Sequence, residues 1–347
     1  MTGSRGNRED PRPRDEHPPA MTQKERFLGT LLGTGADRFP LFDLEPAEET
    51  LDKWRGEGMP SDRSFAEFFD IEEHVSVGLN LRSNPRFVGS PAELDDAVLF
   101  ERHYNPDDPA RYEEDFVDNC RRSARDGRVV SIDAWGGGLL QMLGTGDWHS
   151  LEALMIAFVE KPALIERVLG KVVDHYCACL ERTLSRVRVD YAALYEPIAS
   201  PAGPVISPAM FERYALPGYR RVLALLESHG VALRILCTTG GDLSALFPPL
   251  IEAGINGFWI SNTRSANTDY PTLRRTFGPD LALIGGVDSG ALRHDDEDAV
   301  RRAVTETVPG LLESGRYLPC LDDRPRGDVS YGQYALFRRT LSELAGL

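Results

Sequence analysis

The chain has 347 residues, 41% of them hydrophobic, and a formal net charge of −15 from 39 basic and 54 acidic residues. This length allows one large domain or two ordinary ones. The negative charge argues against nucleic acid or an anionic membrane surface as a general partner. No apolar run approaches the ~18 residues that a membrane span requires.

The first 20 residues, MTGSRGNREDPRPRDEHPPA, are charged and rich in proline, and they lack the apolar centre of a signal peptide. We predict a disordered extension over residues 1–20 and a single folded domain over 21–347. The five cysteines are odd in number and widely spaced. Without a secretory signal, this pattern favours reduced thiols and a cytoplasmic protein.

Short apolar segments along the chain predict strands. They do not alternate strictly with polar residues, which is typical of parallel strands buried on both faces. The eight segments are Phe39–Leu44, Val75–Leu79, Arg128–Ala134, Tyr191–Tyr195, Ala232–Cys237, Gly257–Ile260, Leu281–Val287 and Tyr317–Leu321.

Amphipathic segments between these strands predict helices. Ser207 suits an N-cap, Pro208 the first helical position and Gly230 the stop of one such helix. The other predicted helices are Leu151–Phe158, Pro162–Val187, Asp242–Ala253, Pro271–Phe277, Asp296–Ser314 and Ser330–Ala345. The repeated alternation of strand and helix predicts an α/β fold of the (β/α)₈ TIM-barrel type.

Catalytic groups on such a barrel lie at the carboxyl ends of the strands and in the loops that follow. The residues at those positions are unusually polar, and they form our candidate site. They are Asp43, Glu45, Asn80, Arg82, Asp133, Trp135, Tyr195, Glu196, Cys237, Thr239, Ser261, Asn262, Asp288, Cys320, Asp322 and Asp323.

Four stretches, in this order and spacing, resemble the uroporphyrinogen decarboxylase superfamily. They are MTQKERFLGTLLGTGADRFPLF, GPVISPAMFERYALPGYRRVLALLESHGV, LALIGGVDSGAL and VPGLLESGRYLPCLDDRPRGDVSYGQY. The resemblance covers nearly the whole chain from Met21 and implies a (β/α)₈ barrel. It also implies one of two chemistries: removal of carboxylates from a tetrapyrrole without a cofactor, or methyl transfer involving corrinoids or thiols, often with zinc.

The decarboxylases of the superfamily carry arginines just after their first strand, where they bind the carboxylates of the substrate. The matching loop here offers Asp43, Glu45, Glu48 and Glu49 instead, which would repel a polyacid. Arg38 precedes the predicted strand, so we expect it at the opposite end of the barrel. We therefore expect a reaction other than uroporphyrinogen decarboxylation.

The zinc-dependent methyltransferases of the superfamily carry His-x-Cys at the end of the fifth strand and a Cys near the end of the eighth. The matching positions here are Cys237, Thr239 and Cys320. Zinc needs three protein ligands in a catalytic site, and Glu196 or Asp322 could supply the third. The alternative is that the two cysteines are buried packing residues.

The resemblance implies an enzyme that transfers a methyl group between a small methylated substrate and a corrinoid or thiol acceptor. Its candidate catalytic residues are Glu196, Cys237 and Asp322, and its candidate zinc ligands are Cys237, Cys320 and Glu196. Zinc and a corrinoid (cobalamin) supplied by a partner protein are the candidate cofactors, and a homodimer is a further expectation. The candidate substrate-binding residues are Asp43, Asn80, Asp133, Trp135, Tyr195, Thr239, Asp288 and Asp323.

Two alternatives stay open. One is a decarboxylase or lyase that acts on a small carboxylic acid or a porphyrinogen-like substrate. The other is a barrel without catalysis that binds a ligand or partner.

Overall fold

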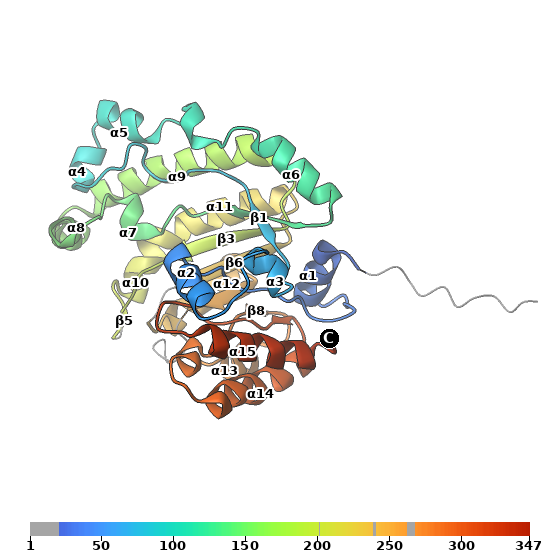
Figure 1. Cartoon of the computed structure of the whole chain (residues 1–347). Coiled ribbons are helices and arrows are strands. Elements are labelled where there is room, and N and C mark those ends of the chain that lie inside the picture. Colours follow the sequence, from blue (N-terminus) through green and yellow to red (C-terminus); the bar gives the residue numbers. More distant parts are fainter. Residues whose placement is uncertain (1–20, 201, 239–240, 262–267) are drawn as a thin grey trace, which may run out of the picture.

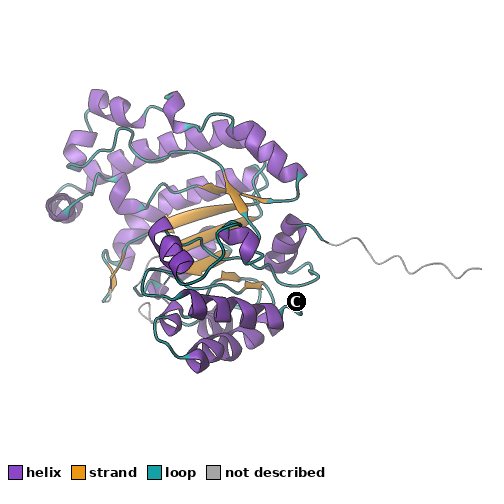
Figure 2. Cartoon of the chain, viewed as in Figure 1, coloured by secondary structure: helices purple, strands orange, loops and turns teal. Residues whose placement is uncertain are grey.

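The computed structural model describes residues 21–200, 202–238, 241–261 and 268–347. The predicted extension over 1–20, together with Thr239 and Asn262, lies outside the described residues. A curled parallel sheet occupies the centre of the molecule, enclosed by helices (Figure 2). Its seven strands lie in the order β1-β2-β3-β6-β7-β8-β9. They are β1 (His74–Ser76), β2 (Val129–Asp133), β3 (Tyr191–Glu196), β6 (Leu233–Thr238), β7 (Gly257–Ile260), β8 (Ala282–Ile284) and β9 (Tyr317–Leu318).

Seven of the eight predicted strands are thus present, but the segment Phe39–Leu44 is not a strand. Pro40 lacks the N–H that a sheet ladder needs. The segment nevertheless runs between the two edges of the sheet. The Leu41 carbonyl accepts a 2.8 Å hydrogen bond from the Glu72 N–H near β1, and burial raises the pKa of Asp43 while the Leu321 N–H beyond β9 acts to lower it. A fully closed eight-stranded barrel is therefore not confirmed.

The helices surround the sheet, with α4, α5, α6 and α9 on one side and α13, α14 and α15 on the other (Figure 1). The α-helices are α1 (Gln23–Leu32), α2 (Glu48–Gly56), α3 (Phe65–Phe68), α4 (Pro91–Leu94), α5 (Ala97–Tyr104), α6 (Phe116–Arg125), α7 (Leu139–Met142), α8 (Trp148–Glu160), α9 (Pro162–Leu184), α10 (Pro208–Met210), α11 (Leu216–Ser228), α12 (Phe247–Ala253), α13 (Tyr270–Phe277), α14 (Glu297–Glu313) and α15 (Tyr331–Leu344). Short helical turns cover Pro109–Arg111, Phe211–Ala215, Ser244–Leu246 and Ser289–Leu292, and a hairpin joins β4 (Ala199–Ser200) to β5 (Gly203–Pro204).

The helix predicted from Ser207 onward is confirmed, and the Ser207 side chain accepts the Met210 N–H as an N-cap. Residues Phe211–Ala215 form a π turn between α10 and α11. Pro217, in the first turn of α11, explains this turn because it cannot donate a hydrogen bond to the carbonyl four residues earlier.

Replacing Ser207 with alanine is expected to lower the free energy of unfolding by about 1 kcal/mol, because the first turn of the helix loses its cap. Urea denaturation of the wild type and the variant measures this difference. The matched control is Ser61→Ala at an exposed serine outside any helix, which should change stability by less than ~0.5 kcal/mol. An equal loss in both variants would contradict the capping role.

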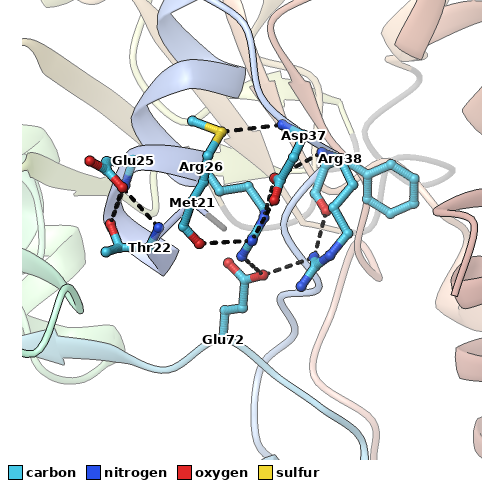
Figure 3. Close-up of polar contacts among 8 residues, drawn as sticks. Met21, Thr22, Glu25, Arg26, Asp37, Arg38 and Glu72 are labelled. Atoms are coloured by element: carbon cyan, nitrogen blue, oxygen red, sulfur yellow. Dashed lines mark hydrogen bonds and ion pairs between the residues drawn. The ribbon is translucent and has the colours of Figure 1, made fainter. Parts of the chain in front are cut away.

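The amino end of the sheet is closed by α1 and a network of charged residues (Figure 3). Arg26 is buried and pairs with Asp37 at 2.7 Å and with Glu72, just before β1, at 2.8 Å. Arg38 reaches the same Glu72 carboxylate at 2.8 Å and donates to the Phe39 carbonyl. The prediction that Arg38 lies at this end, away from the carboxyl ends of the strands, is confirmed.

Candidate active site

Side chains alternate between the two faces of each strand, so strand register decides which of the candidate residues meet. Tyr195 pairs with Cys237, and Cys237 pairs with Trp259, across β3, β6 and β7. Cys237 and Trp259 belong to the apolar cluster on the inner face of the sheet, as do Tyr191 and Ala193 on the strand of Tyr195. All three paired residues therefore face the interior, and Tyr195 remains 43% exposed at the rim.

Asp133, the last residue of β2, joins these three side chains. Val129, four residues earlier on β2, belongs to the same inner cluster. Because side chains on one face of a strand recur every second residue, Asp133 points inward as well. Burial raises the pKa values of both Cys237 and Tyr195, and the negative charge of Asp133 adds to both shifts, as expected for a carboxyl on the same face. We call Asp133, Tyr195, Cys237 and Trp259 the mouth group.

The Asp133 carboxyl is held by its own loop. One oxygen accepts the N–H groups of Trp135 and Gly136, each at 3.0 Å. Burial raises the pKa of Asp133, while these two hydrogen bonds and the positive charge of Arg82 act to lower it. A carboxyl whose pKa is raised by burial is suited to hold a proton at the carboxyl end of the sheet.

The two cysteines predicted as ligands both face the interior. Cys237 and Cys320 are in the same inner cluster. Burial raises the pKa of each thiol well above its usual value, with further contributions from Asp133 at Cys237 and from Asp43 at Cys320. The Cys237 sulfur lies 3.9 Å from the carbonyl oxygen of Ile235. Both thiols are thus protonated groups packed among apolar side chains.

Glu196 lies elsewhere, because it follows Tyr195 directly and so points to the outer face of β3. It is 1% exposed and accepts hydrogen bonds from Trp135 Nε1 (2.9 Å), the Tyr219 hydroxyl (2.9 Å) and the Leu139 N–H (3.1 Å). Burial raises its pKa to about 7, against the effect of these donors. The structure therefore does not bring Glu196 together with Cys237, as the predicted zinc triad and catalytic set required.

Zinc does not fit the residues present. Within residues 21–200, 202–238, 241–261 and 268–347, no three His, Cys, Asp or Glu side chains are grouped so that they could hold a metal ion. The internal gaps, 201, 239–240 and 262–267, contain none of these four residue types. We therefore derive no chemical step through a metal.

Two further acidic candidates are buried near the carboxyl end of β9. Asp43 accepts a 3.1 Å hydrogen bond from the Tyr334 hydroxyl, and burial raises its pKa to about 6 while the nearby Arg338 acts to lower it. Asp322 accepts the Ser289 N–H at 2.9 Å. Both side chains are almost fully buried, so these hydrogen bonds join Asp43 to α15 and Asp322 to the loop after β8.

The remaining candidates lie around the opening. Asn80 is exposed, and its side-chain oxygen accepts the Arg82 N–H at 3.1 Å. Asp288 is half-buried and caps the turn Ser289–Leu292. Asp323, also half-buried, pairs with Arg326 at 3.1 Å. Trp135 is buried on the outer side, where its indole ring packs on Tyr219 with the ring centroids 3.9 Å apart.

The sequence analysis missed Trp259. Its strand reads GFWI, which looks like ordinary apolar packing. Only the pairing of Trp259 with Cys237 across β6 and β7 identifies it as part of the mouth group.

Comparisons with known proteins agree with this architecture. The uroporphyrinogen decarboxylase (URO-D) family model matches residues 139–318. The uroporphyrinogen decarboxylases of Acidovorax sp. (strain JS42) and Acidovorax ebreus (strain TPSY) are each 26% identical to this chain, over 264 and 242 residues. These matches cover 72% and 66% of this chain, and 66% and 62% of the relatives' own lengths.

A methyltransferase from Methanosarcina mazei has a similar solved structure, with a TM-score of 0.59 and 16% sequence identity. The match covers 93% of this chain and 99% of the methyltransferase. At this identity the likeness establishes the fold alone. In the part of the chain that the structure describes, every helix is too short or too polar to cross a membrane.

Proposed function

Since the chain belongs to the uroporphyrinogen decarboxylase family, we propose that it is an enzyme that transfers a methyl group from a small methylated substrate to a corrinoid or thiol acceptor. The observation that carries the proposal is the mouth group. Cys237 and Trp259 form an apolar floor that suits a methyl group, and Asp133 and Tyr195 place a carboxyl and a hydroxyl beside it. The structural likeness to a methyltransferase supports a barrel of this shape.

In such a transfer, the bond from the methyl carbon to the substrate heteroatom breaks as the bond to the acceptor nucleophile forms. The heteroatom leaves with the electron pair and needs a proton. We assign that proton to the Asp133 carboxyl, because burial raises its pKa and its loop holds it at the opening. The Tyr195 hydroxyl would orient the heteroatom. A corrinoid delivered by a partner protein would supply the nucleophile.

The charges at the two ends of the barrel support a small substrate rather than a tetrapyrrole with many carboxylates. Arg38 is engaged with Glu72 at the amino end of the sheet. The segment Phe39–Leu44 carries the buried Asp43 near its end, Glu45 follows it directly, and Glu48 and Glu49 begin α2. These acidic groups would repel a polyanionic substrate.

A second candidate function is decarboxylation of a small carboxylic acid. It is favoured by two cationic side chains near the mouth group, since Arg82 acts on the pKa of Asp133 and Arg324 acts on that of Tyr195. Both could bind a carboxylate.

One assay separates the two reactions. The purified protein is mixed with a panel of methyl ethers, methylamines and methyl thioethers, with cob(I)alamin or a thiol as acceptor. We expect methylcobalamin in the absorption spectrum or a methylated thiol in the mass spectrum. Parallel reactions measure carbon dioxide release from uroporphyrinogen and small acids. Carbon dioxide release without methyl transfer would replace our proposal with the second candidate, and inactivity in both assays would favour the non-catalytic barrel.

A further inference from the structure

A cavity of about 390 Å³ lies between the loop after β1 and the helices beside it, and none of the four mouth-group residues lines it. Its walls come from the loop after β1, the glycine loop after β2, α5, α7 and α9. The polar residues that matter most in its lining are Asn80, Arg82, Arg86, Tyr104, Thr145 and Tyr176.

Two arginines, Arg82 and Arg86, make the lining of the cavity positively charged. Within the described ranges neither Arg82 nor Arg86 forms a salt bridge. Both side chains lie against the segment around α7. A Cβ at Gly137 would come within 3.1 Å of Arg82 Nε, and a Cβ at Gly146 within 3.2 Å of Arg86 Nη2. Gly137, with φ of 105°, therefore allows the Arg82 side chain to lie directly over the loop.

The cavity also contains a hydroxyl without a partner. Thr145 Oγ1 is buried and has no hydrogen-bond partner in the described part of the chain. A buried polar atom of this kind costs free energy unless something satisfies it. A ligand oxygen in the cavity could accept hydrogen bonds from both guanidinium groups, and the Thr145 hydroxyl beneath the cavity wall is a donor that nothing in the described chain uses.

We propose that this cavity binds the carboxylate of a small organic acid. Asn80 and Arg82 also line a neighbouring hollow that includes Asp133, so the cavity adjoins the mouth group. If the proposed function holds, the acid is the methyl donor itself. Its carboxylate would lie between Arg82 and Arg86, and its methylated end would lie at Asp133 and Tyr195. The substrate class is then a methylated carboxylic acid.

The surrounding charges favour a carboxylate over a phosphate. Asp133 and Glu113 both line the adjoining hollow that Arg82 borders. A second negative charge on the ligand would meet these two acidic groups, whereas a monoanion is matched by the two arginines. Phe87 supplies an apolar wall for the body of the acid.

Isothermal titration calorimetry with benzoate, benzamide and inorganic phosphate tests the proposal. We expect benzoate to bind, and benzamide, which has the same shape without the charge, to bind at least tenfold more weakly. Arg82→Gln and Arg86→Gln should each weaken benzoate binding by roughly 10- to 100-fold, since each removes a charge-assisted hydrogen bond. Arg220→Gln, at an exposed arginine of α11 outside the cavity, should bind benzoate as the wild type does.

Equal binding of benzoate and benzamide, no binding of either, or full binding in both cavity variants would overturn the proposal. Tighter binding of phosphate than of benzoate would also overturn it, in favour of a phosphate site. The titration needs no methyl acceptor. Failure of the methyl-transfer assay therefore leaves a binding result standing, and failure to bind benzoate leaves methyl transfer open.

Discussion

An Asp133→Asn enzyme is expected to lose about 100- to 10,000-fold in kcat for methyl transfer, the usual contribution of a positioned general acid. The amide keeps the size of the side chain and can still accept the N–H groups of Trp135 and Gly136 through its oxygen. It cannot release a proton to the leaving heteroatom. The loss should appear in kcat with a smaller change in KM, measured in the cob(I)alamin assay.

The pH dependence gives a second measure of the same role. If Asp133 acts as an acid, the wild-type rate falls as pH rises through the pKa of this carboxyl, which burial raises above its usual value. The Asp133→Asn variant should lack that fall. The control is Asp174→Asn, which removes an exposed ion pair with Arg221 on the helical surface and should keep the wild-type rate. An active Asp133→Asn enzyme with an unchanged pH profile would refute the assignment.

The protein is expected to become less stable as pH rises, because the buried Glu196 carboxyl then loses its proton. The pKa of this buried carboxyl is about 7 in the folded protein, against a usual value of 4.5. The folded state therefore holds a proton that the unfolded state has lost over this window. The stabilisation is complete below about pH 4.5 and disappears as pH rises through about 7, a change of up to about 3 kcal/mol.

A Glu196→Gln variant should lack this contribution because its side chain does not titrate. Urea denaturation of both proteins at several pH values between 4.5 and 7.5 measures the difference in the free energy of unfolding. Asp43, whose pKa burial raises to about 6, adds a slope of the same sign to both proteins and cancels in the comparison. Glu212→Gln, at an exposed glutamate on the π turn, is the control. A difference between wild type and Glu196→Gln that is constant with pH would contradict the prediction.

The helices and most strands could be read from the sequence because their signals are local. The cap at Ser207 and the apolar runs at Tyr191–Tyr195 and Gly257–Ile260 are properties of neighbouring residues. The segment Phe39–Leu44 looks equally apolar, yet it is not a strand. Its Phe42 side chain instead stacks on His74 with the ring centroids 4.3 Å apart. Whether a segment at the edge of the sheet becomes a strand depends on hydrogen bonds with backbone groups that are distant in the sequence.

The candidate site also depends on contacts that the local sequence does not reveal. The sequence places Tyr195 and Glu196 together at a strand end, and only one of two adjacent strand residues can face the interior. In the structure Tyr195 faces the interior. Glu196 faces outward, where it accepts hydrogen bonds from Trp135, Tyr219 and Leu139. Glu196 therefore does not lie beside Cys237, as the predicted zinc site with Cys237, Cys320 and Glu196 required.

The sequence by itself determined the family, the order of strands and helices, and the placing of polar residues at the strand ends, since all three depend on residues close together in the chain. The tertiary structure alone decided which of those residues share a space. Asp133, Tyr195, Cys237 and Trp259 meet because strand register and the alternation of side chains bring four separate strands to one opening. Arg82 and Arg86 share a cavity because the loop after β1 folds against the segment around α7.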